Sequence, residues 1–421
     1  MSVSPSLRAL TIPDFRALLL TRFANTLSFQ MPGIAMQWYV YDRTGDPMLL
    51  AFVGLAQFLP SLLFTLPAGH VADSYDRRNV LRVAYFVMLL ATLIFGYIVH
   101  LGYVWPIFVL LFFLGTARAF AGPASFALVP AIVPLEDFPR AVALNSIVWQ
   151  AATIAGPVIG GWTYALRGRP VAIGIATIDL GDVVFWIASA LSLVALISIS
   201  TLKFSQKVQK KAVSLAEVFE GLRFVFSEKL ILATISLDLF AVLFGGATAL
   251  LPMYAKDILH IGAEGLGWLR SAPAIGASCT ALFLTFFPLK RHVGRQLLVF
   301  VFGFGLATIV FGFSRDFVVS LVALFATGAF DMVSVVLRGQ MIQLGTPDAM
   351  RGRVSAVNQV FIGASNELGE FESGAVAKAF GAIFSVVFGG VVTCLVVVSW
   401  AAMFPRLRKL DRVESLQTHA Q

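Results

Sequence analysis

Charged side chains stand within long apolar stretches of this sequence. Asp238 and Asp331 are surrounded by aliphatic and aromatic residues, and so are Arg118 and Arg270. A charge near the middle of a membrane costs at least about 2.5–3.5 kcal/mol when it faces lipid. These side chains are therefore expected to face a protein interior or a wet cavity, where the two carboxylates could carry protons. The alternative is a set of satisfied polar contacts that only fix helix packing.

A second group of carboxylates lies in the segment SNELGEFESG, residues 365–374. Glu367 and Glu370 are three residues apart and share a helix face, whereas Glu372 points elsewhere, toward the outer interface. Buried carboxylates can bind protons near neutral pH, so this group supplies candidate coupling or gating residues. The alternative is a structural clamp, in which Glu367 and Glu370 pair with Arg270 or with backbone donors.

The composition indicates that membrane helices hold these residues. Of the 421 residues, 58% are hydrophobic and only 13% are charged, and the mean hydropathy is +0.85. Soluble domains average about 25% charged residues, and a helix needs about 20 apolar residues to cross a bilayer. The sequence predicts an all-α membrane protein with twelve transmembrane helices, at residues 16–40, 47–69, 79–100, 104–131, 140–165, 180–201, 229–255, 264–288, 295–313, 317–343, 355–379 and 381–404.

A polar linker divides these helices into two sets of six. It covers residues 202–228, so the sequence predicts an N-terminal bundle over 1–201 and a C-terminal bundle with a short tail over 229–421. The two halves match at an offset of 213 residues, which indicates a 6+6 duplication of the kind found in transporters. At this offset three polar pairs coincide near the middle third of the membrane: Asn25 with Asp238, Gln57 with Arg270, and Arg118 with Asp331.

The positive charges predict the orientation. With the N-terminus inside, 21 of the 31 Lys and Arg residues fall on the inner side and 6 on the outer side. The remaining four lie within spans: Arg22, Arg118, Arg270 and Arg338. This bias follows the positive-inside rule and predicts that both termini are cytoplasmic. The formal net charge of +8 therefore reports topology, and no nucleic-acid partner is expected.

Other chemistries have little support in the sequence. No nucleotide-binding loop of the GxxxxGK type is present, so ATP-driven transport by this chain alone is not expected. The five histidines are scattered, and no metal site is predicted. The sequence predicts a transporter and not an enzyme, with no cofactor.

Three local motifs carry a family resemblance. GHVADSYDRR, from Gly69 to Arg78, is similar to a GxxxDRxGRR signature, with Ser74 and Asp76 at positions where Arg and Gly are usual. LGTARAFAGPA contains Arg118 in an LxxxRxxxG pattern, and AGPVIGG matches a GPxxGG pattern. Together they resemble the major facilitator superfamily, and the third motif resembles its drug–proton antiporter branch. The resemblance implies two pseudo-symmetric bundles that alternate access across the membrane.

Each motif has a physical interpretation for gating. Asp73 can accept hydrogen bonds at a helix end, while Arg77 and Arg78 anchor the loop to the cytoplasmic face. In AGPVIGG, Gly156 and Gly160 allow a second helix to approach closely, and Pro157 adds a kink. The resemblance further implies that this motif, with Gly161, meets the other half; close packing alone would also explain it.

The phrases TPDAMRGRVSAVNQVF, SNELGEFESG and GWLRSAPAIGA resemble a bacterial efflux subgroup that includes the enterobactin exporter. The resemblance implies a bacterial inner-membrane protein in contact with lipids, and a monomer is expected. It also implies export of a siderophore-like or amphiphilic drug-like molecule driven by protons. The alternatives are a nutrient–proton symporter, a lysolipid flippase, and a membrane sensor or scaffold without transport.

These implications assign roles to the polar residues. Asp238 and Asp331 are the preferred proton carriers, with Arg118 tuning their proton affinity, and Arg338 is either a substrate contact or a snorkelling side chain. The remaining residues of the expected substrate and proton pathway are Arg22, Asn25, Gln30, Gln37, Gln57 and Arg270.

Overall fold

Long helices account for most of the structure, because a helix satisfies its backbone hydrogen bonds within its own segment. The computed structural model describes residues 9–126, 128–134, 136–173, 176–203, 215–348 and 350–416. The helices of the first half are α1 (Pro13–Thr44), α2 (Pro47–Ser74), α3 (Arg77–Leu101), α4 (Trp105–Phe126), α5 (Val129–Ile132), α6 (Phe138–Tyr164) and α7 (Val183–Thr201). Between α6 and α7 lie β1 (Pro170–Ile173), β2 (Ala176–Asp179) and the short 3₁₀ helix η2 (Leu180–Asp182).

The second half has a similar series of long helices but differs at its start, where α8 precedes an interrupted first span. Its elements are α8 (Leu215–Ser227), α9 (Lys229–Gly245), η3 (Ala247–Leu250), α10 (Leu251–Met253), η4 (Tyr254–Ile258), α11 (Gly262–Phe286), α12 (Val293–Phe313), α13 (Phe317–Leu344), α14 (Arg351–Phe380), α15 (Ala382–Met403), α16 (Pro405–Lys409) and η5 (Val413–Leu416). The helix α8 lies within the segment predicted to be a linker.

Within the described residues, ten helices are long and apolar enough to cross a membrane. Of the twelve expected spans, those in α1 and α14 are missing from this set, although these helices have 32 and 30 residues. Both carry several charges, which lower their hydropathy: Arg16, Arg22 and Asp42 in α1, and Arg353, Glu367 and Glu370 in α14. All twelve positions are thus long enough to cross a membrane, and the charges of α1 and α14 explain why these two fall outside the set.

The contacts group the chain into two compact units. The first unit contains Met1–Thr44, Ala56–Val213 and Gly262–Ser271. The second unit contains Gly45–Leu55, Ser214–Ile261 and Ala272–Gln421. The start of α2 therefore groups with the second unit and the start of α11 with the first. The sequence expectation had placed each of these segments with its own half.

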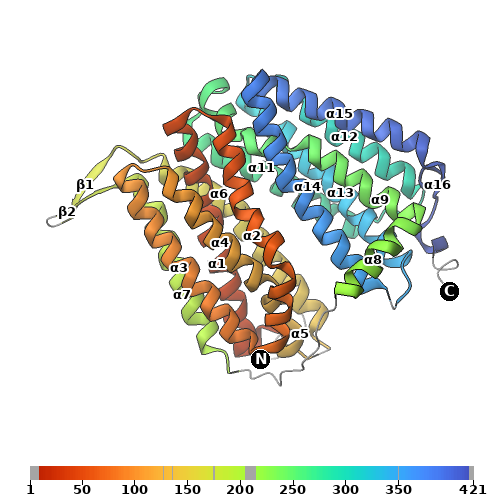
Figure 1. Cartoon of the computed structure of the whole chain (residues 1–421), viewed down its shortest axis with the longest axis horizontal. Coiled ribbons are helices and arrows are strands. Elements are labelled where there is room, and N and C mark those ends of the chain that lie inside the picture. Colours follow the sequence, from red (N-terminus) through yellow and green to blue (C-terminus); the bar gives the residue numbers. More distant parts are fainter. Residues whose placement is uncertain are drawn as a thin grey trace. The chain divides into compact units, whose positions relative to one another are not determined.

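Small side chains allow close packing within each unit. In the first unit, α1 packs against α6 and α7, and α3 packs against α4 and α7 (Figure 1). In the second unit, α12 packs between α13 and α15, and α9 packs against α14 and α15. Gly305 of α12 lies against Gly390 of α15, where a Cβ on either residue would meet the other's carbonyl oxygen.

Two local features differ from the sequence expectation. The span predicted over 229–255 is interrupted, because α9 ends at Gly245 and the chain continues through η3, α10 and the π-helical turn η4. The loop between α6 and α7 contains a two-stranded antiparallel hairpin, in which Pro170 pairs with Asp179 and Val171 with Ile178. Its strands are four residues each, too short to show an alternating hydropathy pattern.

Candidate functional site

A buried ion pair lies within the second unit. Arg338 of α13 contacts the Asp238 carboxylate of α9 through Nη1, and its Nε donates a hydrogen bond to Ser334 Oγ at 3.1 Å. The side chains of Arg338 and Asp238 are only 6% and 8% exposed. Snorkelling had been an alternative for Arg338, but its guanidinium is held inside the unit by a carboxylate and a hydroxyl.

Asp331 lies about two helical turns before Arg338 in α13 and borders a cavity. The cavity has a volume of about 180 Å³ and is lined by apolar, hydroxyl and amide side chains together. Its lining includes Phe304, Phe311, Thr308, Thr327, Asp331 and Asn366. A smaller recess of about 10 Å³ is lined by Asp331, Asp238 and Ser334. Asp331 therefore borders both the cavity and the recess lined by Asp238, the acidic member of the ion pair.

The break after α9 shapes this cavity. Gly245 and Gly246 follow one another at the end of the helix, and both line the cavity with Ala247 and Thr248. The Gly246 carbonyl accepts a hydrogen bond from Ser373 Oγ at 3.2 Å, so the interrupted backbone is satisfied by α14. Irregular backbone at membrane depth is tolerated where it is buried or lines a cavity, and discontinuous helices form binding sites in many transporters.

A second polar cluster lies in the first unit around Arg22 of α1. Its Nε donates to Ser125 Oγ at 3.2 Å and its Nη2 to the Ser125 carbonyl at 2.6 Å, while Nη1 donates to Asn145 Oδ1. The guanidinium thus joins α1 to the end of α4 and to α6. Any substrate contact by Arg22 would have to exchange one of these bonds.

The other predicted pathway residues lie at separate places in the first unit. Arg118 is exposed and stacks over the Phe29 ring, 4.0 Å from its centroid. Gln30 packs against Gly156, and Oε1 of Gln37 is buried without a hydrogen-bond partner in the described part of the chain. The other members, Asn25, Gln57 and Arg270, are half-buried. Only Asp238, Asp331 and Arg338 are brought together in one site.

The loop between α2 and α3 is held by Asp76 and two arginines. Asp76 caps α3 by accepting a hydrogen bond from the Arg78 N–H at 2.8 Å. Arg78 and Arg82 donate to the carbonyls of Leu202 and Ser200 at the end of α7, where the helix dipole favours positive charge. Arg77 Nε donates weakly to the Ala72 carbonyl at 3.4 Å. The side chain of Asp73 lies outside the described residues.

The glycines of AGPVIGG form close helix contacts within the first unit. A Cβ on Gly156 would meet Gln30 Cβ, and a Cβ on Gly160 would meet the Met31 carbonyl oxygen, both in α1. On the other side of α6, Gly161 lies against Ala263 and Gly267, and Gly267 lies against the Pro157 carbonyl. This motif therefore packs α6 against α1 and against the start of α11.

The carboxylates of SNELGEFESG lie along the start of α2 within the second unit. A Cβ built on Gly54 would be 2.7 Å from Glu370 Oε2 and 3.2 Å from Glu367 Oε2, so both carboxylates converge on this glycine. Glu372 is half-buried. Nearby, Lys378 Nζ lies 2.9 Å from Asp46 Oδ2, and this hydrogen bond lowers the pKa of the Asp46 carboxyl.

Sequence reasoning missed the partners of the charged residues. Ser125, Ser334 and the cavity-lining Thr308 and Thr327 are common residue types in membrane helices and give no local signal. Asn145 coincides with Asn358 at the 213-residue offset, which was a usable indication, and Asp76 had been noted only as a departure from a signature. The double glycine at Gly245–Gly246 could have indicated the helix break.

Comparisons with known proteins agree on the kind of protein. A family model described as "Transmembrane secretion effector" matches residues 4–421. The enterobactin exporter EntS of Shigella boydii serotype 4 (strain Sb227) is 25% identical over 355 residues, covering 82% of this chain and 81% of that protein.

Two solved structures share the fold at low sequence identity. The nucleoside transporter NupG has a TM-score of 0.73 at 14% identity, covering 93% of this chain and 99% of NupG. A bacterial homologue of the human lysosomal transporter Spinster, in an inward-facing and occupied conformation, has a TM-score of 0.74 at 13% identity, covering 97% of this chain and 100% of the homologue. This likeness establishes the major facilitator fold and nothing of the substrate.

Proposed function

Because this chain belongs to the transmembrane secretion effector family of major facilitator transporters, we propose that it exports an organic small molecule in exchange for protons. The chain is a multi-pass membrane transporter and not an enzyme. The observation that carries the proposal is the position of Asp331, which borders both the cavity and the recess lined by Asp238, the acidic member of the ion pair.

The charges of this cluster favour proton binding. Asp238 and Asp331 supply two negative charges when both are ionised, and Arg338 supplies one positive charge. An uncompensated negative charge in an apolar interior is costly, and a proton on one carboxylate removes that cost. Asp238 is already paired, so Asp331 is the proposed proton carrier. When a substrate or the opposite access state changes the surroundings of Asp331, the proton can leave.

The lining of the cavity favours an amphiphilic substrate. Phe304 and Phe311 offer aromatic faces, while Thr308, Thr327 and Asn366 offer hydrogen bonds. Drug-sized ligands occupy sites of about 300–1,000 Å³, so a cavity of about 180 Å³ holds only one part of such a molecule. A catecholate siderophore or an aromatic drug-like cation fits this chemistry, and the relative named for enterobactin supports the first.

The proposal includes the setting of the protein. We place it in the inner membrane of a bacterium with both termini in the cytoplasm, as a monomer surrounded by lipid. The proton gradient is its energy source, without a cofactor. Its partners are the substrate, protons and lipids, and nucleic acid is not among them.

The test is proton-coupled transport in proteoliposomes with an imposed pH gradient. Enterobactin and an aromatic cationic dye are offered as separate substrates, and a pH-sensitive fluorophore reports the counter-movement of protons. Asp331→Asn should reduce gradient-driven transport at least tenfold, because Asn keeps the shape but cannot carry a proton. Exchange of labelled for unlabelled substrate without a gradient should remain.

The matched control is Asp348→Asn, which removes an exposed surface carboxylate that pairs with Arg351. It should transport at the wild-type rate. Rates of both variants are normalised to the amount of folded protein. If Asp331→Asn then shows unchanged gradient-driven transport, Asp331 is not the proton carrier. Transport of neither substrate class by the wild type would rule out the proposed substrates.

Glu367 and Glu370 have a separate proposed role in gating. Their convergence on Gly54 supports a contact that changes hydrogen-bonding partner or protonation between access states. Glu367→Gln and Glu370→Gln should preserve folding, and at least one of them should weaken gradient-driven export more than downhill exchange. A structural clamp predicts that Gln is tolerated and that Ala lowers the melting temperature. Wild-type rates and pH dependence in both Gln variants would leave only the clamp.

A further inference from the structure

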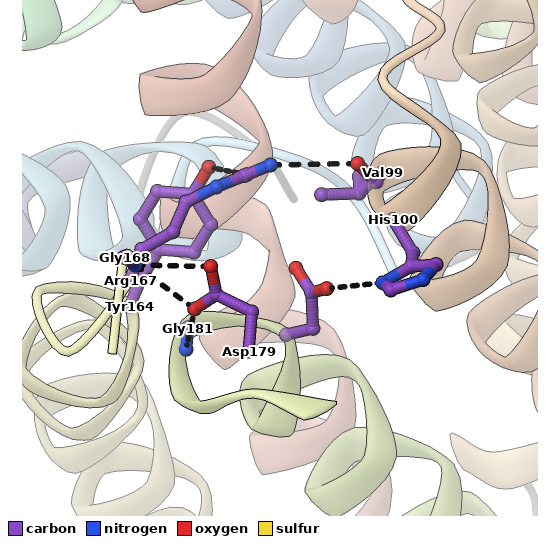
Figure 2. Close-up of polar contacts among 8 residues, drawn as sticks. Val99, His100, Tyr164, Arg167, Gly168, Asp179 and Gly181 are labelled. Atoms are coloured by element: carbon purple, nitrogen blue, oxygen red, sulfur yellow. Dashed lines mark hydrogen bonds and ion pairs between the residues drawn. The ribbon is translucent and has the colours of Figure 1, made fainter. Parts of the chain in front are cut away.

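A polar cluster outside the candidate site gathers at one end of the first unit, where α3 and α6 end and α7 begins (Figure 2). His100, in the last turn of α3, lies with Nδ1 3.2 Å from Asp182 Oδ2. The imidazole is 53% exposed, whereas the Asp182 side chain is only 3% exposed. A solvent-exposed imidazole thus contacts a carboxylate that is buried from solvent.

The second carboxylate oxygen of Asp182, Oδ1, is buried and has no hydrogen-bond partner among the residues that the structure describes. Asp182 stands directly before α7, but its side chain makes no capping hydrogen bond to that helix. A buried polar atom without a partner is costly. The carboxylate therefore has His100 as its hydrogen-bonding partner, while Arg167 acts on it electrostatically.

The neighbouring charged groups are held by other partners. Arg167 donates to the Tyr164 hydroxyl and to the Val99 carbonyl, and it lies 5.0 Å from the Tyr39 ring centroid. Asp179 accepts hydrogen bonds from the N–H groups of Gly168 and Gly181 at 2.9–3.0 Å, which closes the base of the hairpin (Figure 2).

Two further charges reach the cluster from α1. Arg43 lies over the Tyr39 ring at 5.9 Å, and Asp42 acts electrostatically on Tyr164. Arg167 keeps its charge at every accessible pH. Among these groups, His100 is the side chain whose type titrates in the physiological range.

We propose that His100 and Asp182 form a proton-binding site, separate from the cluster at Asp331, that fastens the start of α7 to the end of α3 when His100 is protonated. A neutral imidazole donates a hydrogen bond to Asp182 in which only the acceptor is charged. An imidazolium donates a bond in which both partners are charged, and this attraction is strengthened where the carboxylate is withdrawn from solvent. Arg167, in the segment after α6, joins that segment to the end of α3 without regard to pH, through the Val99 carbonyl.

Hydrogen–deuterium exchange of the purified full chain in lipid nanodiscs tests this proposal. Exchange is measured from pH 5.5 to 8.5, after correction for intrinsic rates, in peptides covering the end of α3 and the start of α7. The wild type should lose protection in both peptides by about fivefold as the pH rises, because the pair then loses the positive charge of the imidazolium. His100→Gln and Asp182→Asn should show low protection with no such pH dependence.

A fixed charge provides the decisive comparison. His100→Lys should keep both peptides protected throughout the pH range, because the ammonium stays charged. The control is His292→Gln, which removes the exposed His292–Asp411 pair of the second unit and should leave the profile unchanged. The proposal would be overturned if protection in the wild type did not depend on pH. It would also be overturned if His100→Gln showed the same pH dependence as the wild type. Should His100→Gln fail to fold, a pH-dependent profile in His100→Lys would also overturn it.

Discussion

Asp238 and Arg338 are both almost wholly withdrawn from solvent, so each compensates the charge of the other. The exchange of such a pair for apolar residues is often neutral, whereas removal of one partner costs about 3–5 kcal/mol because a buried charge is left uncompensated. Asp331 lines the same recess as Asp238 of this pair. In the proposed mechanism, the pair is the fixed electrostatic surrounding of an exchangeable proton on Asp331.

A double-mutant cycle tests the pair at the residue scale. Arg338→Met should lower the free energy of unfolding by about 3–5 kcal/mol, because Asp238 then lacks its partner. The double variant Asp238→Asn with Arg338→Met should recover most of this loss. The measurement is thermal or denaturant unfolding of purified protein at pH 7. Additive losses in the double variant would show that the two side chains are not coupled.

The Asp46–Lys378 pair gives a pH-dependent prediction. The hydrogen bond from Lys378 lowers the pKa of Asp46 in the folded protein, so the pair stabilises the fold above the unfolded pKa of about 3.9. That stability is lost as the pH falls through the lower, folded pKa. Both side chains are partly exposed, so Lys378→Met should cost only about 0.2–1 kcal/mol at pH 7.

The difference between Lys378→Met and wild type should shrink as the pH falls below the unfolded pKa of about 3.9, and it should vanish once Asp46 is protonated in the folded protein. Melting curves of both proteins between pH 3 and 7 provide the measurement. A difference that persists or grows toward acid pH would mean that Lys378 acts through packing or another partner.

At the scale of the elements, glycines decide how closely helices approach. Gly160 of α6 lies against the backbone of α1 at Met31, where no side chain can move aside. Gly33 of α1 has open space where its Cβ would be. The two positions lie in neighbouring helices, yet substitution by alanine should have opposite effects.

Gly160→Ala should lower the free energy of unfolding by about 1–3 kcal/mol, because the added methyl group forces α6 away from α1. Gly33→Ala should be neutral or should stabilise by about 0.4–1 kcal/mol, because alanine restricts the unfolded chain and favours the helix. Melting temperatures of the two variants against wild type check both expectations. Equal tolerance of both substitutions would contradict the tight α1–α6 contact.

At the scale of the whole molecule, the distribution of Lys and Arg predicts which side of the membrane each loop faces. Cysteines placed at Ser205 and Ser415, in a background lacking Cys279 and Cys394, report this orientation. Both should react with a membrane-impermeant maleimide only after the cells are opened. A cysteine at Arg315, on the predicted outer side, is the matched control and should react in intact cells. Labelling of Ser205 or Ser415 in intact cells would reverse the topology.

The sequence by itself determined the fold class and the order of the helices. Hydropathy and length are local properties, so each span could be identified from its own residues, including those in α1 and α14 despite their charges. Asp238 and Asp331 could be singled out for the same reason, since a charge in an apolar stretch is unusual wherever it lies.

Only the tertiary structure decided which side chains meet. The contact of Arg338 with Asp238, the convergence of Glu367 and Glu370 on Gly54, and the bonds from Arg22 to Ser125 depend on the rotation and depth of separate helices. The pairing of His100 with Asp182 joins positions 82 residues apart. Such contacts depend on non-local packing, which no local pattern in one sequence encodes, and they distinguish a pathway residue from a structural one.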